Sequence, residues 1–128
     1  MVQECTEFRA SRRIVITSRA KAILIAKTAK SKKAEDVVVL DMRKAANFTD
    51  YFVIASGSSD RQVKAIADAI DDVLRKEGFS VRHKEGYKEA VWALIDSGNV
   101  IAHIFYKETR EFYSLENLWA DAPRIKIR

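Results

Sequence analysis

Two short apolar runs constrain the fold of this chain more than any other feature. Residues 37–40 are VVVL and residues 51–55 are YFVIA, so both runs are apolar throughout and rich in β-branched or aromatic side chains. Strands of this kind are buried on both faces of a sheet, whereas a strand with one wet face alternates apolar and polar residues. The two runs therefore predict interior strands of an α/β sheet with helices packed against it.

The segments around these runs predict two helices. Ser18 can cap a helix over about residues 18–33. Ser58 or Ser59 can cap a second helix, which has a clear amphipathic period and closes at Gly78.

The last half of the chain predicts further strands and short helical turns. A tight turn at 97–99 separates two β-like runs and indicates a hairpin. We expect strands at 79–83, 91–96 and 100–106, followed by one or two helical turns within 110–119. The fold class is therefore α/β, with a mixed sheet of about five strands.

Length and composition predict a soluble protein. The chain has 128 residues, of which 48% are apolar and 32% are charged, as in ordinary globular proteins. No apolar run approaches the roughly 20 residues of a membrane span, and charged residues interrupt any secretory signal. We expect a cytoplasmic protein with residues 1–17 as a basic, disordered extension and residues 18–128 as a single α/β domain. Cys5 is the only cysteine, so an intramolecular disulfide is excluded.

The positive charge of the chain is concentrated near its N-terminus. Residues 1–33 contain nine Lys/Arg and two Asp/Glu, a net charge of +7, whereas residues 34–128 contain fourteen and sixteen, a net charge of −2. A basic arm suits polyanions and predicts a weak contact with RNA. A solvated helix face behind a disordered tail explains the same charges equally well, and both interpretations stay open.

The best candidate for a catalytic motif is the turn SGS at 56–58, between a strand and a helix. Backbone amides at such a helix N-terminus can hold phosphate, and nucleotidyltransferases place a Gly-Ser turn in this setting. Those enzymes also need two or three carboxylates on a nearby strand for magnesium, but the following strands carry only Asp96. We therefore expect no catalytic residue, no cofactor and no metal site. Asp68 and Asp72 are interpreted as a solvated helix face.

Aromatic residues crowd the last third of the chain, and one strand among them predicts a binding surface. Trp92 and Leu94 alternate with Val91, Ala93 and Ile95, so the two sets point to opposite faces of the sheet. We expect the smaller set to face the helices and Trp92 to lie on an uncovered face. An exposed tryptophan of this kind is typical of a protein-binding patch, although most aromatic stripes belong to a core.

Five motifs follow one another along the chain. They are KAED at 33–36, DYFVIASGSSDRQV at 50–63, WALID at 92–96, VIAHIF at 100–105 and REFYSLENLWADAP at 110–123. Together they resemble the ribosomal silencing factor family, the Iojap-related proteins, over about residues 20–123. One departure is Asn99, where family members often have an acidic residue, and it weakens an ionic contact with a basic partner there.

The resemblance implies a regulator of translation that is not an enzyme. Members of this family bind the large ribosomal subunit at ribosomal protein L-fourteen and block joining of the small subunit, which represses translation under nutrient limitation. The resemblance also implies a nucleotidyltransferase-like fold without the catalytic carboxylates, and a homodimer. By the match, the expected partner-binding residues are Trp92, Leu94, Asp96, His103, Tyr113, Leu115, Leu118 and Trp119.

Two other functions stay open on the sequence. One is a divergent nucleotidyltransferase-like protein, which magnesium-dependent nucleotide binding would reveal. The other is an RNA-binding module that uses the basic N-terminal arm, which a steep salt dependence of RNA affinity would reveal.

Overall fold

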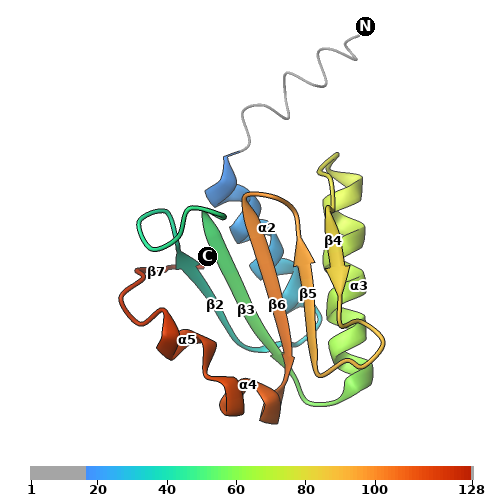
Figure 1. The fold of residues 1–128 in the computed structure, drawn as a ribbon. Coiled ribbons are helices and arrows are strands. Elements are labelled where there is room, and N and C mark those ends of the chain that lie inside the picture. Colours follow the sequence, from blue (N-terminus) through green and yellow to red (C-terminus); the bar gives the residue numbers. More distant parts are fainter. Residues whose placement is uncertain (1–16, 128) are drawn as a thin grey trace, which may run out of the picture.

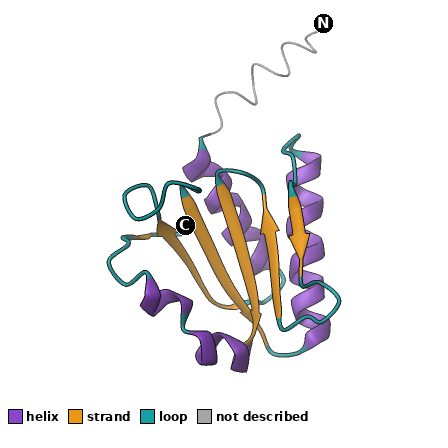
Figure 2. Cartoon of the chain, viewed as in Figure 1, coloured by secondary structure: helices purple, strands orange, loops and turns teal. Residues whose placement is uncertain are grey.

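The computed structural model describes residues 17–127, so the predictions for Cys5 and for the rest of residues 1–16 lie outside the described residues. Within residues 17–127 the chain forms four helices and one six-stranded sheet (Figures 1 and 2). The helices are α2 (Ser18–Ser31), α3 (Asp60–Lys76), α4 (Lys107–Tyr113) and α5 (Leu115–Leu118). The strands are β2 (Glu35–Asp41), β3 (Tyr51–Gly57), β4 (His83–Glu85), β5 (Trp92–Asp96), β6 (Val100–Tyr106) and β7 (Arg124–Ile125). The α/β class with a mixed sheet is confirmed, with six strands in place of about five.

β3 is an interior strand of the sheet, whose strand order is β4-β5-β6-β3-β2-β7. All seven residues of β3 are buried, which confirms a strand covered on both faces. It pairs in parallel with β6 and antiparallel with β2. For the run 37–40, the prediction of a strand buried on both faces is wrong in the first half, because Val37 and Val38 are only half-buried. The short β7 pairs only with Val39 and Leu40, so it leaves the start of β2 without an outer neighbour.

α2 and α3 cover one face of the sheet and lie behind it in Figure 1. The apolar stripe of α3 is buried against the sheet, as its amphipathic period predicts. This helix-side core also contains alternate residues of the strands, among them Val53, Ala93, Ile95 and Ile104. No helix within residues 17–127 has both the length and the apolar character that a membrane crossing requires.

Side-chain caps fix where the two long helices begin. The N-cap of α2 is Thr17 rather than Ser18, since Thr17 Oγ1 accepts a hydrogen bond from the Ala20 amide at 3.1 Å. Ser59 caps α3 by accepting from the Gln62 amide at 3.1 Å.

The strand predicted at 79–83 is wrong for most of its length, because β4 begins at His83. The Phe79 amide donates to the Leu74 carbonyl at 2.8 Å and Gly78 has φ +85°, so these residues complete the end of α3. Phe79 and Val81 still pack against the helix-side core, but as a connection and not as a strand.

A second apolar cluster lies on the face of the sheet opposite α2 and α3. It consists of Leu40, Met42, Phe52, Ile54, Ile101, Phe105 and Ala122. Leu115 and Trp119 pack against this cluster from the C-terminal segment, defined here as residues 107–125. Among the described elements, no helix lies in front of β5 on this face (Figure 1). The second face is therefore covered on the β2 side and more open on the β5 side.

Candidate functional site

Aromatic rings contact one another in succession across the second face. From β5 towards β3, the centroid distances are 4.9 Å for Trp92–Phe105, 6.3 Å for Phe105–His103 and 4.6 Å for His103–Phe52. The series extends from Trp92 to Tyr113 at 5.1 Å, and from Phe52 to Trp119 at 6.2 Å and to Phe48 at 6.1 Å. We call this set the aromatic face: Phe48, Phe52, Trp92, His103, Phe105, Tyr113 and Trp119.

Trp92 lies on the predicted side of the sheet, together with Leu94, because both belong to the surroundings of the second apolar cluster. Ala93 and Ile95 point the other way into the helix-side core, as predicted. Val91 is an exception: it precedes β5 and is 47% exposed, so its predicted place among the helix-facing residues is wrong. The uncovered state predicted for Trp92 is also wrong, since the indole is half-buried and stacked on Phe105 at an interplanar angle of 30°.

His103 is a neutral, buried histidine in the middle of the aromatic face. It is 5% exposed, and burial lowers its pKa to about 4. Its Nδ1 accepts a hydrogen bond from Trp92 Nε1 at 3.1 Å, so the proton of the neutral ring belongs on Nε2. Within residues 17–127, Nε2 has no hydrogen-bond partner. The bond to Trp92 orients the indole on the sheet.

Four of the remaining predicted residues come from the C-terminal segment. Tyr113 and Leu118 are 54% and 71% exposed, whereas Leu115 and Trp119 are half-buried against the second apolar cluster. A pocket of ≈ 490 Å³ lies between Tyr113 and Trp92, and a second of ≈ 490 Å³ lies beside Leu118 and Trp119. The aromatic face therefore carries exposed apolar groups and a hollow near each end.

Asp96 does not join this cluster. It lies at the far end of β5 from Trp92, where its Oδ1 accepts from the Gly98 amide at 2.8 Å and closes the hairpin. Nearby, Lys21 Nζ donates to Asn99 Oδ1 at 2.7 Å and to the Ser97 carbonyl at 3.2 Å. Burial lowers the pKa of Lys21, and the charge of Asp96 opposes that effect. Asp96 thus has a local structural role in the hairpin.

Phe48, Phe52 and Phe105 belong to the aromatic face but were absent from the predicted set. The alternation of β3 and β6 would have placed Phe52 and Phe105 opposite the helix-side residues. Phe48 had no such signal, because it lies in the connection before β3 and is 56% exposed.

Arg110 is a further buried polar residue that the sequence did not single out. Its guanidinium lies in a groove of ≈ 540 Å³ between the end of β3, the start of β2 and the C-terminal segment. Nη2 donates to Glu116 Oε2 at 2.6 Å and Nη1 donates to Ser56 Oγ at 2.7 Å. Burial raises the pKa of Glu116, but the hydrogen bonds and charge of Arg110 outweigh it, so the pKa is lowered.

The turn at 56–58 is occupied by contacts within the chain. The Ser58 amide donates to Gln62 Oε1 at 2.7 Å and is therefore not free for a phosphate. A Cβ at Gly57 would lie 2.9 Å from Val63 Cγ2, so close packing of β3 on α3 explains this glycine.

Comparisons with known proteins identify the family. The family described as "Ribosomal silencing factor during starvation" matches residues 15–128. The protein named "Ribosomal silencing factor RsfS" of Halalkalibacterium halodurans is 44% identical over 96 residues, covering 75% of this chain and 82% of that one. Its namesake in Bacillus subtilis is 48% identical over 92 residues, covering 72% and 78%. An X-ray structure from Chromobacterium violaceum has a TM-score of 0.80 at 29% identity, covering 81% of this chain and 87% of that one. This chain belongs to the ribosomal silencing factor family.

Proposed function

We propose that this protein represses translation by binding the large ribosomal subunit at ribosomal protein L-fourteen, which blocks joining of the small subunit. Membership of the family supports translation regulation and ribosome association. The observation that supports a docking surface is the aromatic face, with Tyr113 and Leu118 exposed near its ends. In this proposal the protein acts in the cytoplasm under nutrient limitation, as a binding protein and not as an enzyme.

The aromatic face has the properties of an anchoring surface. Aromatic side chains supply large contact areas at low entropic cost and dominate many protein interfaces. Here Trp92 is held in place by Phe105 and by its bond to His103, so little ordering remains to be done on binding. Tyr113 and Leu118 are both more than half exposed, so they add apolar surface near the ends of this face.

The contacts of the turn at 56–58 argue against a nucleotide site there, which favours a binding protein over a nucleotide-processing enzyme. Its glycine packs against Val63, and the Ser58 amide already has an acceptor. Within residues 17–127 no three His, Cys, Asp or Glu side chains form a group that would hold a metal ion. Titration calorimetry with ATP and magnesium should therefore give no binding heat, and saturable magnesium-dependent binding would contradict this part of the proposal.

Sucrose-gradient sedimentation with purified subunits tests the proposed function. The protein should co-sediment with large subunits and lower the fraction of joined ribosomes. Leu118→Asp should weaken co-sedimentation, because it puts a charge on the exposed apolar end of the surface. Ala65→Asp, on the exposed side of α3, is the matched control. Subunit joining that is unchanged at saturating protein would contradict the proposal.

Contact with RNA is a second candidate, favoured by the exposed lysines at the end of α2. These are Lys27, Lys30, Lys32 and Lys33, and within the described part of the chain none of them forms an ion pair. Such a patch suits a phosphate backbone, so the affinity for RNA should fall steeply with salt. Replacing all four by Gln should flatten that dependence, and an unchanged salt slope would remove this candidate.

A homodimer is the competing use of the aromatic face. A second copy would bury the same exposed apolar side chains, Tyr113 and Leu118. Sedimentation equilibrium of the wild type and of Leu118→Asp distinguishes the two uses, because a dimer through this face should dissociate in the variant.

A further inference from the structure

We propose that Arg110 is a positioning residue for the partner-binding surface. It locks the C-terminal segment to the edge of the sheet and so places Tyr113, Leu118 and Trp119 around Trp92 and the second apolar cluster. This inference rests on the proposed function for the partner, but the placement of the segment is argued from its own contacts.

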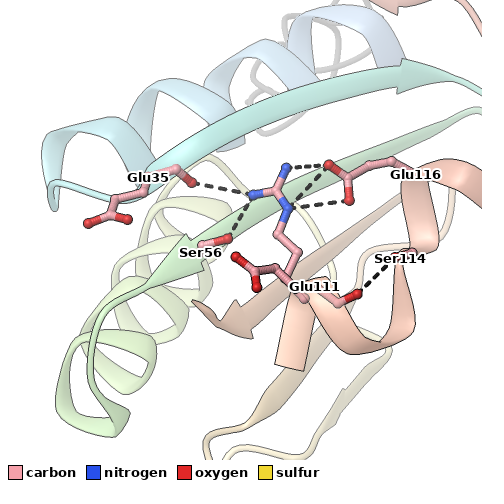
Figure 3. Close-up of polar contacts among 6 residues, drawn as sticks. Glu35, Ser56, Glu111, Ser114 and Glu116 are labelled. Atoms are coloured by element: carbon pink, nitrogen blue, oxygen red, sulfur yellow. Dashed lines mark hydrogen bonds and ion pairs between the residues drawn. The ribbon is translucent and has the colours of Figure 1, made fainter. Parts of the chain in front are cut away.

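Arg110 joins parts of the chain that are far apart in sequence. Nη1 donates to Ser56 of β3 and, at 3.5 Å, to the Glu35 carbonyl of β2, while Nη2 donates to Glu116 of α5 (Figure 3). Nε also donates to both carboxylate oxygens of Glu116, at 3.2 and 3.3 Å. Arg110 itself is 7% exposed. A planar guanidinium with this many fixed acceptors sets direction as well as distance.

The chain bends between the two partners of the ion pair. Ser114 separates α4 from α5 and has φ +48°, a left-handed conformation that is uncommon for residues other than glycine. Its hydroxyl donates to the Glu111 carbonyl at 2.8 Å, which stabilises the bend. The bend brings Glu116 back to Arg110, so the ion pair closes the loop.

The loop that this ion pair closes places side chains at two positions on the aromatic face. Tyr113, just before the bend, contacts Trp92 at 5.1 Å. Leu115 and Trp119, just after it, pack against the second apolar cluster. α5 contains no fully buried residue, so beyond the packing of Leu115 its position depends on the ion pair. The position of the exposed apolar groups therefore depends on Arg110.

The groove around Arg110 is better suited to holding the C-terminal segment than to binding a ligand. The guanidinium already donates hydrogen bonds to Glu116, Ser56 and Glu35, so an anion could bind it only by breaking the ion pair with Glu116. The groove is also lined by both signs of charge, with Glu111 and Asp36 balanced by Lys107 and Arg124, so its lining does not select an anion.

The experiment compares Arg110→Met, Glu116→Gln and the double variant, with Arg110→Lys as the conservative change. Arg75→Met is the control, because it breaks an exposed ion pair with Asp71 on α3. Each protein is measured for affinity to purified large subunits and for hydrogen exchange at the amides of Trp119 and Ala122, against amides of β3. Glu116→Gln keeps the side-chain shape, so it tests the pair even where Arg110→Met folds poorly.

We expect Arg110→Met and Glu116→Gln to exchange faster at Trp119 and Ala122 than wild type, with β3 unchanged, and to bind about tenfold more weakly. Arg110→Lys should recover part of both properties, and Arg75→Met should match wild type. The double variant leaves no orphan charge, so its stability should recover while its affinity stays low.

Three results would overturn the inference: a segment that stays protected in Arg110→Met, faster exchange without loss of affinity, or a double variant that binds like wild type. If the wild type itself does not bind large subunits, the proposed function fails separately. The exchange measurements would still decide whether Arg110 holds the segment.

Discussion

Trp92 has a structural contact and, in the proposed function, also belongs to the partner-binding surface. Its indole stacks on Phe105 and is held by His103, but it also borders the pocket that Tyr113 and Val91 line. In the proposed function, a residue in this position would contribute both to the stability of the fold and to partner binding.

Trp92→Ala should therefore change two quantities. The lost stacking should lower the free energy of unfolding by about 2 kcal/mol, less than the 3–5 kcal/mol of a fully buried tryptophan. Affinity for the large subunit should fall by at least about tenfold. Urea unfolding followed by circular dichroism and a binding titration measure the two effects, and Arg75→Ala, on the exposed side of α3, is the control. Normal binding by the folded variant would show that Trp92 lies outside the interface.

His103 should make the stability of the protein depend on pH. Burial lowers its folded pKa from 6.5 to about 4, so the unfolded chain binds a proton first as the pH falls. The free energy of unfolding should therefore decrease between pH 6.5 and pH 4, by up to about 3 kcal/mol.

Urea titrations across this pH range measure the effect. His103→Gln does not titrate and should lose this part of the pH dependence, whereas His83→Gln, at an exposed position, should keep it. Equal pH profiles for His103→Gln and wild type would contradict the assignment.

At the scale of elements, the parts that were predicted are those encoded in local patterns. The period of α3, the apolar run of β3 and the turn at 97–99 each depend on neighbouring residues in sequence, and all three are present in the structure. Residues at the start of the predicted strand 79–83 instead complete the end of α3, because the Phe79 amide donates a hydrogen bond to the Leu74 carbonyl of the helix.

The candidate site was predicted only in part, because only some of its residues follow a local sequence pattern. Alternation along β5 placed Trp92 and Leu94 on the second face. The course of α4 and α5 depends on Arg110 reaching Glu35 and Ser56, contacts between residues far apart in the chain that no local period contains.

The contact between β3 and α3 yields a prediction at this scale. Gly57→Ala should destabilise the protein by about 1–3 kcal/mol, because the new methyl group would lie 2.9 Å from Val63 Cγ2 and 3.0 Å from Val63 N. Ser58→Ala removes only an exposed hydroxyl and should cost about 0.5 kcal/mol or less. Chemical denaturation measures both, and a neutral Gly57→Ala would show that the strand–helix junction can relax.

At the scale of the whole molecule, the two faces of the sheet are packed differently. The helix-side core is closed by α2 and α3, whereas the second cluster is closed only in part and carries the aromatic face. Deletion of residues 1–16 should leave this arrangement intact, because Thr17 caps α2 and the two described clusters are built from residues 22–127.

Thermal unfolding of the shortened chain measures this expectation. The melting temperature should stay close to that of the full chain. A decrease of more than about 8 °C would correspond to a loss of 1 kcal/mol or more for a domain of this size, and would mean that the deleted residues pack on the fold.

The outermost strands restrict how this molecule can associate. β4 has three residues, all exposed, and β7 has two, so both margins of the sheet offer few free main-chain N–H and C=O groups. Another chain therefore finds only short stretches, such as the start of β2, on which to continue the hydrogen-bond ladder. The short outer strands therefore disfavour growth into fibrous aggregates. In the proposed function, recognition would therefore depend on the side chains of the aromatic face and the hollows near its ends, where single substitutions can change the choice of partner without changing the backbone.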